Sequence, residues 1–292
     1  MNTQLLLAIL IVLAIAVTAI VCLAPPIIPI PEKHLTPITS ATRTSIKGAA
    51  SQRGGVRIIV LVDNYPSPSN PKLQTAWGLS LYVETPYATF LFDTGPYSSV
   101  LEHNAQVLGV NLSSIDFVVI SHAHGDHTGG LPLIARIKPG IRVYIPAEAR
   151  YLASRIKSLG LRPYPVNTTV QVAPGVYVLK PLYGPPWEEA AAIKTSHGLV
   201  VLVGCSHPGV VNIVKEAIST LHERVYMVIG GFHMAGEPPA VVEEVARELI
   251  SLGVAKIYPI HCSGDEIREY LKEHYPQNYG DGHVGLVINI PG

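Results

Sequence analysis

The sequence predicts an α/β layered domain that follows an apolar N-terminal segment. From Gly55 to Gly292, short apolar runs with β character alternate with helical stretches, and this length is sufficient for one large domain with a substantial core. Segments that carry histidine begin where four of the apolar runs end. Layered α/β folds place their functional sites at such strand ends, so the same pattern predicts a site as well as a fold.

The N-terminal segment is long and apolar enough to predict one transmembrane anchor over residues 1–24. Leu5–Ala24 departs from strongly apolar types only at Thr18 and Cys22, and a bilayer core needs roughly 20 such residues. A cleaved signal peptide is the alternative, but its apolar core is normally about 7–15 residues long. Residues 25–54, rich in Pro, Ser and Thr, are expected to form a linker. The basic residues after the span favour a single-pass protein with a cytoplasmic domain at 55–292; they are Lys33, Arg43, Lys47 and Arg53, against Glu32.

The elements of the domain follow from apolar runs and helical periodicity. Val241, Val245 and Leu249 recur at helical spacing with Glu244 and Arg247 outward, which predicts an amphipathic helix. A second helix is expected at Ser98–Leu108. The expected strands are Val56–Val62, Leu79–Glu84, Thr89–Phe92, Asp116–Ile120, Val176–Leu179, Leu199–Val203, Val225–Ile229 and Lys256–Ile260.

Charge and motif content exclude several classes of function. From Gly55 onward the chain carries 17 basic and 20 acidic residues, so it has no electrostatic footprint for nucleic acid. Three cysteines are too few for a disulfide framework. The sequence contains no Gly-x-Ser-x-Gly nucleophile elbow, no phosphate-binding Gly-x-x-x-x-Gly-Lys loop and no dinucleotide fingerprint.

The strongest functional signal is the segment Ser121–Gly130, which reads SHAHGDHTGG. His122, His124, Asp126 and His127 fall within six positions directly after a strand. Imidazole nitrogen and carboxylate oxygen are ligands of Zn²⁺ and similar divalent ions. The spacing lets His122 and His124 face one ion while Asp126 and His127 turn toward a second.

Other strand ends supply further candidate ligands. His207 follows one strand, and His261 follows another; both are expected to bind metal. His233 lies after a third strand and is expected to contact substrate. The remaining histidines are expected to be structural: His34, His103, His197, His222, His274 and His283.

These motifs resemble the metallo-β-lactamase superfamily. The resemblance rests on Phe92–Gly95, the Ser121–Gly130 loop and the late strand-end histidines. Gly204–Gly209, Gly230–His233 and His261–Gly264 resemble one branch, which holds metal-dependent hydrolases together with the 7,8-dihydropterin-6-methyl-4-(β-D-ribofuranosyl)-aminobenzene-5'-phosphate synthases. The resemblance implies a four-layer αββα sandwich with the metals at one edge.

The resemblance also implies a role for each residue. His122, His124 and His207 would hold one divalent ion, and Asp126, His127 and His261 a second; Zn is expected, with Mn, Fe or Mg as alternatives. Asp93 would orient the metal loop. The superfamily usually has a bridging Asp where this chain has Cys205-Ser206, so Cys205 is a possible ligand or bridge and the number of ions, one or two, stays open. The separate histidine of the third motif is also missing, which leaves Glu188 or Glu189 as polar contributors.

Three functions follow from these expectations. The first is a metal-dependent hydrolase of an ester, phosphoester or lactone bond, with Asp126 and His233 as catalytic residues. The second, implied by the branch, is the synthase, a transferase of methanopterin biosynthesis. The third is a non-catalytic metal-binding module anchored to a membrane. The substrate is expected to be a small anion, received by free amides at Gly129-Gly130.

Overall fold

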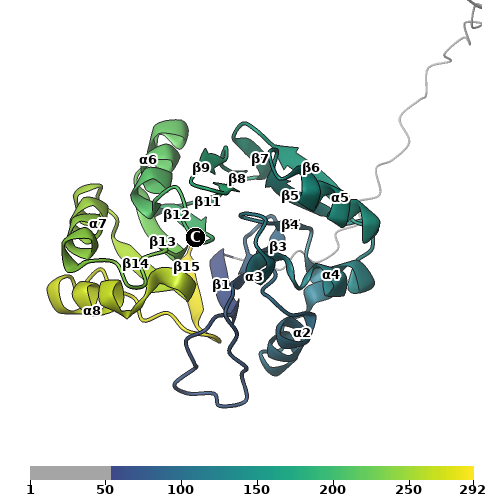
Figure 1. Cartoon of the computed structure of the whole chain (residues 1–292), viewed down its shortest axis with the longest axis horizontal. Coiled ribbons are helices and arrows are strands. Elements are labelled where there is room, and N and C mark those ends of the chain that lie inside the picture. The colour runs from purple at the N-terminus through teal and green to yellow at the C-terminus, as the bar shows by residue number, and fades with distance from the viewer. Residues whose placement is uncertain (1–53) are drawn as a thin grey trace, which may run out of the picture. The chain divides into compact units, whose positions relative to one another are not determined.

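The computed structural model describes residues 54–292, which form two β-sheets packed face to face with helices on both outer surfaces (Figure 1). The larger sheet has the strand order β15-β1-β2-β3-β4-β5-β6, and the smaller has the order β14-β13-β12-β11-β8-β7. A separate pair joins β9 and β10. This arrangement is the αββα sandwich predicted from the sequence.

The strands of the larger sheet are β1 (Gly55–Val62), β2 (Ser80–Glu84), β3 (Thr89–Phe92), β4 (Phe117–Val119), β5 (Arg142–Pro146), β6 (Arg162–Val166) and β15 (Val287–Pro291). The remaining strands are β7 (Val170–Ala173), β8 (Val176–Val178), β9 (Leu182–Tyr183), β10 (Trp187–Glu188), β11 (Ala191–Thr195), β12 (Gly198–Val203), β13 (Val225–Gly231) and β14 (Lys256–Ile260). The helices are α2 (Ser98–Val107), α3 (Gly125–Thr128), α4 (Leu131–Ile137), α5 (Arg150–Ser158), α6 (Val210–Leu221), α7 (Pro239–Ser251) and α8 (Asp265–His274), with 3-10 turns η1 (Leu112–Ser114) and η2 (His261–Ser263).

The central strands read as continuous apolar runs because both faces of each sheet are covered. In β1, Ile58 and Val60 point into the core between the sheets, whereas Ile59 and Leu61 point toward α2, α4 and α5. The second outer layer is α6, α7 and α8, which cover the other sheet through a cluster that includes Val201. Period-two alternation of polar and apolar residues is absent from these central strands for this reason.

The strand directions bring the histidine-bearing segments to one edge. β3, β4, β5 and β6 run parallel in one sheet, and β12, β13 and β14 run parallel in the other. The segments that follow β3, β4, β12, β13 and β14 therefore emerge together (Figure 1). The fold thus positions the site before any side chain is considered.

Among residues 54–292, no helix has the length and apolar character needed to cross a bilayer. The predicted anchor (1–24) and all but the last residue of the predicted linker (25–54) lie outside the described residues. The anchor, the linker and the cytoplasmic orientation therefore stay predictions.

Candidate metal centre

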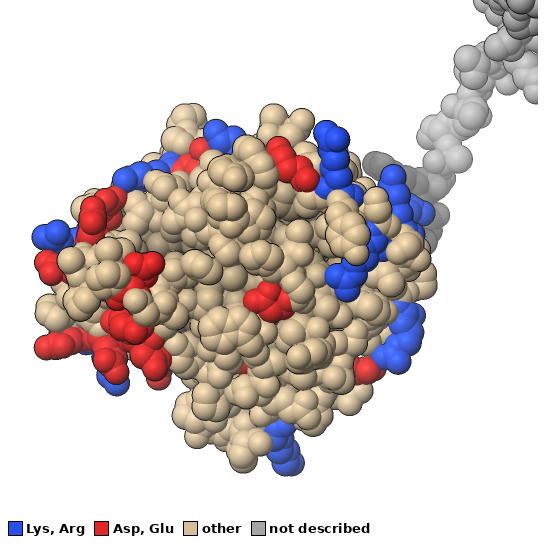
Figure 2. Space-filling model, in the orientation of Figure 1, with Lys and Arg blue, Asp and Glu red and all other residues tan. Residues whose placement is uncertain are grey.

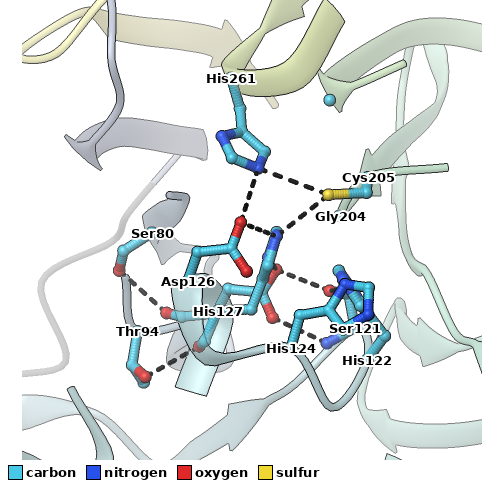
Figure 3. A network of polar contacts seen from close by, with 12 residues as sticks. Ser80, Thr94, Ser121, His122, His124, Asp126, His127, Gly204, Cys205 and His261 are labelled. Carbon is cyan, nitrogen blue, oxygen red and sulfur yellow. Dashed lines mark hydrogen bonds and ion pairs between the residues drawn. The ribbon is translucent and has the colours of Figure 1, made fainter. Parts of the chain in front are cut away.

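The loop after β4 supplies four of the site residues. It leaves the sheet at Ile120 and turns into the short helix α3, which carries Asp126 and His127. His122 and His127 are fully buried, while Asp126 is only partly covered. The backbone of this loop is fixed to the turn after β3, because Thr94 donates to the carbonyl of His127 through both its amide and its hydroxyl (Figure 3).

A first set of donor atoms belongs to His122, His124 and His207, whose ligand atoms lie within 4.8 Å of one another. Nε2 of His122 and Nδ1 of His124 face each other at 3.0 Å. Nε2 of His207 is buried and has no hydrogen-bond partner among the described residues. Burial and the neighbouring histidines lower the pKa of His122 well below its usual value, and that of His207 to about 4. Both imidazoles are therefore neutral at pH 7 and offer lone pairs, as metal ligands must.

A second set consists of Asp126, His127, Cys205 and His261, again within 4.8 Å. The sulfur of Cys205 lies 3.2 Å from Nε2 of His127 and 3.4 Å from Nε2 of His261. Oδ2 of Asp126 lies 3.6 Å and 3.4 Å from the same two nitrogens (Figure 3). One carboxylate, one thiol and two imidazoles thus point at a common centre, a donor set that suits Zn²⁺.

The outward-facing nitrogens of three of these five histidines are bonded to the protein. Nδ1 of His127 donates to Oδ2 of Asp93 at 2.7 Å, and Nδ1 of His122 lies 2.9 Å from the Ser121 hydroxyl. Nδ1 of His261 lies 3.3 Å from the amide oxygen of Asn64. Metal-binding histidines show this arrangement, because the outer bond fixes the tautomer that leaves the inner nitrogen free. The described residues therefore fit two divalent ions.

Asp93 fixes the loop after β4 through three hydrogen bonds. Its two oxygens accept from the amide and hydroxyl of Ser121 and from His127, all at 2.7 Å. Burial lowers the pKa of His127, but the charge and hydrogen bond of Asp93 outweigh it and raise the pKa to about 9, so a bound ion must displace the proton on Nε2. Burial raises the pKa of Asp126, but His261 and His127 outweigh it and lower the pKa to about 2, so this carboxylate stays ionised. A hydrogen bond with Cys262 and burial both raise the pKa of Cys205, so metal binding must displace its proton.

Backbone conformation is strained where these segments meet. Five non-glycine residues of the described chain have positive φ, and four of them line the site: Asp93, Ser206, His233 and His261, at φ 55–62°. Left-handed conformations are disfavoured for residues with a Cβ and concentrate at functional positions. Ser206, His233 and His261 lie in the turns after β12, β13 and β14, which carry donor atoms, and Asp93 lies in the turn after β3, beside the loop that follows β4.

His233 lies beside the first set and outside it. Its ring centroid is 4.5 Å from that of His207, and Cys205, His207 and His233 form a third converging group. A hydrogen bond with Cys262 raises the pKa of His233. This exposed imidazole therefore lies beside the first set of donor atoms, and its expected contact with a substrate stays a prediction.

The two glutamates considered as polar contributors do not converge with the donor atoms. Glu188 accepts from the amides of Gly204, Ser206 and His207 at 2.8–3.1 Å, so it clamps the loop after β12. Burial raises the pKa of Glu188 to about 7, although these bonds oppose the shift. Glu189 is buried with neither oxygen bonded, and burial together with the Asp93 charge raises its pKa well above the usual value.

Two further expectations are settled by hydrogen bonding. The amides of Gly129 and Gly130 donate to the carbonyls of Gly125 and Gly95, so the idea that they receive an anionic substrate is wrong. A Cβ at either glycine would meet the backbone of Pro96 or Thr94 at 1.8–2.2 Å, which explains the glycines by close packing. Five of the six histidines expected to be structural lie in the described part and none joins the converging groups: His103, His197, His222, His274 and His283. His34 lies outside the described residues.

The structure adds residues that sequence reasoning did not assign to the site. Oδ1 of the buried Asp63 accepts from the amide of His261 at 2.8 Å, and burial raises the pKa of Asp63 to about 6. The Trp77 ring lies 5.3 Å from the His261 ring. Position in the sequence was a signal for Asp63 and Asn64, which directly follow β1 as Asp93 follows β3.

Comparisons with known proteins agree with this geometry. Residues 78–216 match the family model of the metallo-beta-lactamase superfamily. A 7,8-dihydropterin-6-methyl-4-(beta-D-ribofuranosyl)-aminobenzene-5'-phosphate synthase of Methanocaldococcus jannaschii is 29% identical over 80% of this chain and 97% of its own.

Comparisons with solved structures indicate the metallo-β-lactamase fold as well. A metal-dependent hydrolase of the beta-lactamase superfamily, Tm1679, is 26% identical with a TM-score of 0.69, over 81% of this chain and 100% of its own. The metallo-beta-lactamase fold protein YhfI of Bacillus subtilis shares the fold with a TM-score of 0.61 at 14% identity, over 81% of this chain and 100% of its own. In its matched region, its strand-end histidines and its fold, this chain is therefore similar to the metallo-β-lactamase superfamily.

Proposed function

We propose that the protein is a metal-dependent hydrolase that directs an activated water at an ester, phosphoester or lactone bond. The observation that carries this proposal is the convergence of two donor sets, in which Asp93, Ser121 and Asn64 hold the outer nitrogens of His127, His122 and His261. Zn²⁺ is the proposed ion, since imidazole, carboxylate and thiolate are its usual ligands. When bound, such an ion lowers the pKa of a water toward about 7 and polarises the bond under attack.

Metal binding, orientation of the water and contact with the leaving group are assigned to different residues of the chain. His122, His124 and His207 would hold one ion, and Asp126, His127, Cys205 and His261 the other. Asp126 stays ionised, because its pKa is about 2, and is partly exposed, so it can accept a hydrogen bond from the attacking water and orient it. His233 borders the first set from the solvent side and would donate a hydrogen bond to the leaving group.

The synthase reaction is the second candidate. It is favoured by the relative of Methanocaldococcus jannaschii, which this chain matches over nearly the whole of that protein. An identity of 29% supports a shared fold and metal site more strongly than it supports a shared substrate. The hydrolase is therefore the leading proposal.

A substrate panel separates the candidates. The full chain, loaded with Zn²⁺ or Mn²⁺, is assayed with p-nitrophenyl phosphodiester, p-nitrophenyl phosphate and lactone substrates. We expect turnover of at least one class, and a loss of about 100-fold or more in His122→Ala and Asp126→Asn. His103→Ala is the matched control, because the one hydrogen bond of the His103 side chain to the described residues is with the Lys72 carbonyl, away from the donor sets. No turnover of any class by protein that holds metal would contradict the hydrolase and favour the synthase or a non-catalytic role.

A further inference from the structure

A groove between α6 and α7 begins at the metal-binding histidines. Its volume is about 410 Å³, within the range of cavities that enclose a small organic ligand. His207 and His233 form one end of it, and His207 belongs to the first donor set. A molecule that lies in this groove, here called the α6–α7 groove, would therefore place its end beside the proposed metals.

The floor of the groove is apolar. Val210, Phe232 and Met234 line it and are almost completely buried. Val241 and Val245 continue the apolar surface along α7. Such a floor favours a flat or aliphatic group that removes this surface from water.

The walls are rich in hydrogen-bond acceptors and negative charge. Glu237 and Glu244 line the groove, and their carboxylates make no hydrogen bond or ion pair with any residue in the range 54–292. Lys215 also lines it, but its charge is offset by Glu248 at 2.7 Å. Asn212 donates its amide nitrogen to the Pro208 carbonyl, which leaves its oxygen as a further acceptor.

The groups that would attract an anion are outweighed by these acceptors. Besides the paired Lys215, two features of positive character reach the groove, the N-terminus of α6 at Val210 and the His233 imidazole. Both lie at the metal end, where the bond to be cleaved would sit. Acidic side chains gather on the side of the molecule where α7 and α8 lie, and basic ones gather on the opposite side (Figures 1 and 2).

We propose that the α6–α7 groove binds the part of the substrate that is not cleaved, and that this part is an apolar or planar group bearing a cationic or hydrogen-bond-donating nitrogen. An amidine, a guanidine or an amino-substituted heterocycle has this chemistry. Glu237 and Glu244 accept its N–H groups while the floor covers its carbon skeleton. The inference rests on the proposed function, since it assigns a substrate class to the same metal site.

Three probes of one shape and different charge test the proposal: benzamidinium, benzamide and benzoate. Their binding to the full chain is measured by calorimetry, with the metal removed and with Zn²⁺ bound. Each exposed carboxylate contributes up to about fivefold to the binding of a cation, so two of them predict that benzamidinium binds about 2- to 30-fold tighter than benzamide. Benzoate is expected to bind the metal-free protein more weakly than benzamide.

Variants on α7 locate the effect. Glu237→Gln and Glu244→Gln should each reduce the preference for benzamidinium by up to about fivefold, and the double variant should abolish it. Glu243→Gln is the matched control, because Glu243 neighbours Glu244 on α7 but lies outside the groove and faces Arg247 at 3.5 Å. Equal binding of the three probes, tighter binding of benzoate to metal-free protein, or an equal loss in Glu243→Gln would overturn the proposal.

The substrate panel separates this failure from failure of the proposed function. Turnover in that panel without a preference for benzamidinium would reject the groove assignment alone. A preference for benzamidinium without turnover of any substrate would reject the hydrolase and leave the groove as a binding site.

Discussion

Replacement of Asp93 by Asn should weaken one metal site and spare the other. Asp93 accepts the Nδ1 proton of His127 at 2.7 Å and two further hydrogen bonds from Ser121 at the same distance. Asn has nearly the same shape, but its amide nitrogen cannot accept a proton. If that nitrogen faces His127, the imidazole must move its proton to Nε2, the atom that points at Cys205 and Asp126.

The magnitude follows from the role of such outer bonds. Loss of a partner that orients a metal-binding histidine typically costs about 10- to 100-fold in affinity, or about 1.4–2.7 kcal/mol. We expect this loss for the second donor set, which contains His127, and little change for the set of His122, His124 and His207. Competition of the metal-free protein with a chromophoric chelator for Zn²⁺ should therefore show one wild-type affinity and one weakened affinity.

Asp116→Asn is the matched control for the Asp93 experiment. Asp116 is exposed at the other end of β4 and accepts one backbone hydrogen bond, from Thr89 at 2.8 Å. Thermal unfolding in the presence of chelator shows whether each variant is folded. Wild-type affinity at both sites of Asp93→Asn, or an equal loss in the Asp116 variant, would refute the reasoning.

Three other predictions concern the thiol, a buried acid and a glycine. Co²⁺-loaded wild-type protein should show a thiolate-to-cobalt charge-transfer band that Cys205→Ser loses and Cys262→Ser keeps; a wild-type spectrum without the band would remove Cys205 from the ligand set. Burial raises the pKa of Glu189. The contribution of its protonated carboxyl to stability is therefore complete below the unfolded pKa of about 4.3 and is lost as pH rises toward the folded pKa. The melting temperature of Glu189→Gln, relative to that of the wild type, should therefore rise between pH 4 and pH 8. A difference in melting temperature that stays constant with pH would contradict this. A Cβ at Gly204 would lie 2.1 Å from the Ser121 hydroxyl, so Gly204→Ala should destabilise the protein by about 1–3 kcal/mol in denaturant titration. Gly125→Ala, where a Cβ meets nothing within 4 Å, should cost little by comparison.

The strands that position the site were predictable because they are buried on both faces. β3 and β14 match their expected ranges residue for residue, and β12 begins one residue earlier than expected. Of the strands that were not expected, β6, β7 and β15 lie at sheet edges and β9 and β10 have two residues each, whereas β5 and β11 are interior strands of five residues. β6 reads RPYPV, and its two prolines argue against a strand except at an edge, where it lies in the larger sheet.

The candidate site was predictable in its residue types and less so in their contacts. Local spacing brings His122, His124, Asp126 and His127 together, and it indicated two ions. That His261 meets Cys205 depends on two segments 56 positions apart in the chain, which no local pattern encodes. The residue type alone did not predict the role of Glu188, because its carboxylate accepts hydrogen bonds from three backbone amides and does not converge with the donor atoms.

The most direct test of the metal site is the metal content of the purified full chain by elemental analysis. The geometry predicts about two equivalents of Zn²⁺ per chain, and a loss of about one equivalent in each of His122→Ala and His261→Ala. Those two residues belong to different donor sets, so each variant should keep the ion that the other loses. Wild-type protein without bound metal, or full retention of metal by both variants, would contradict the account.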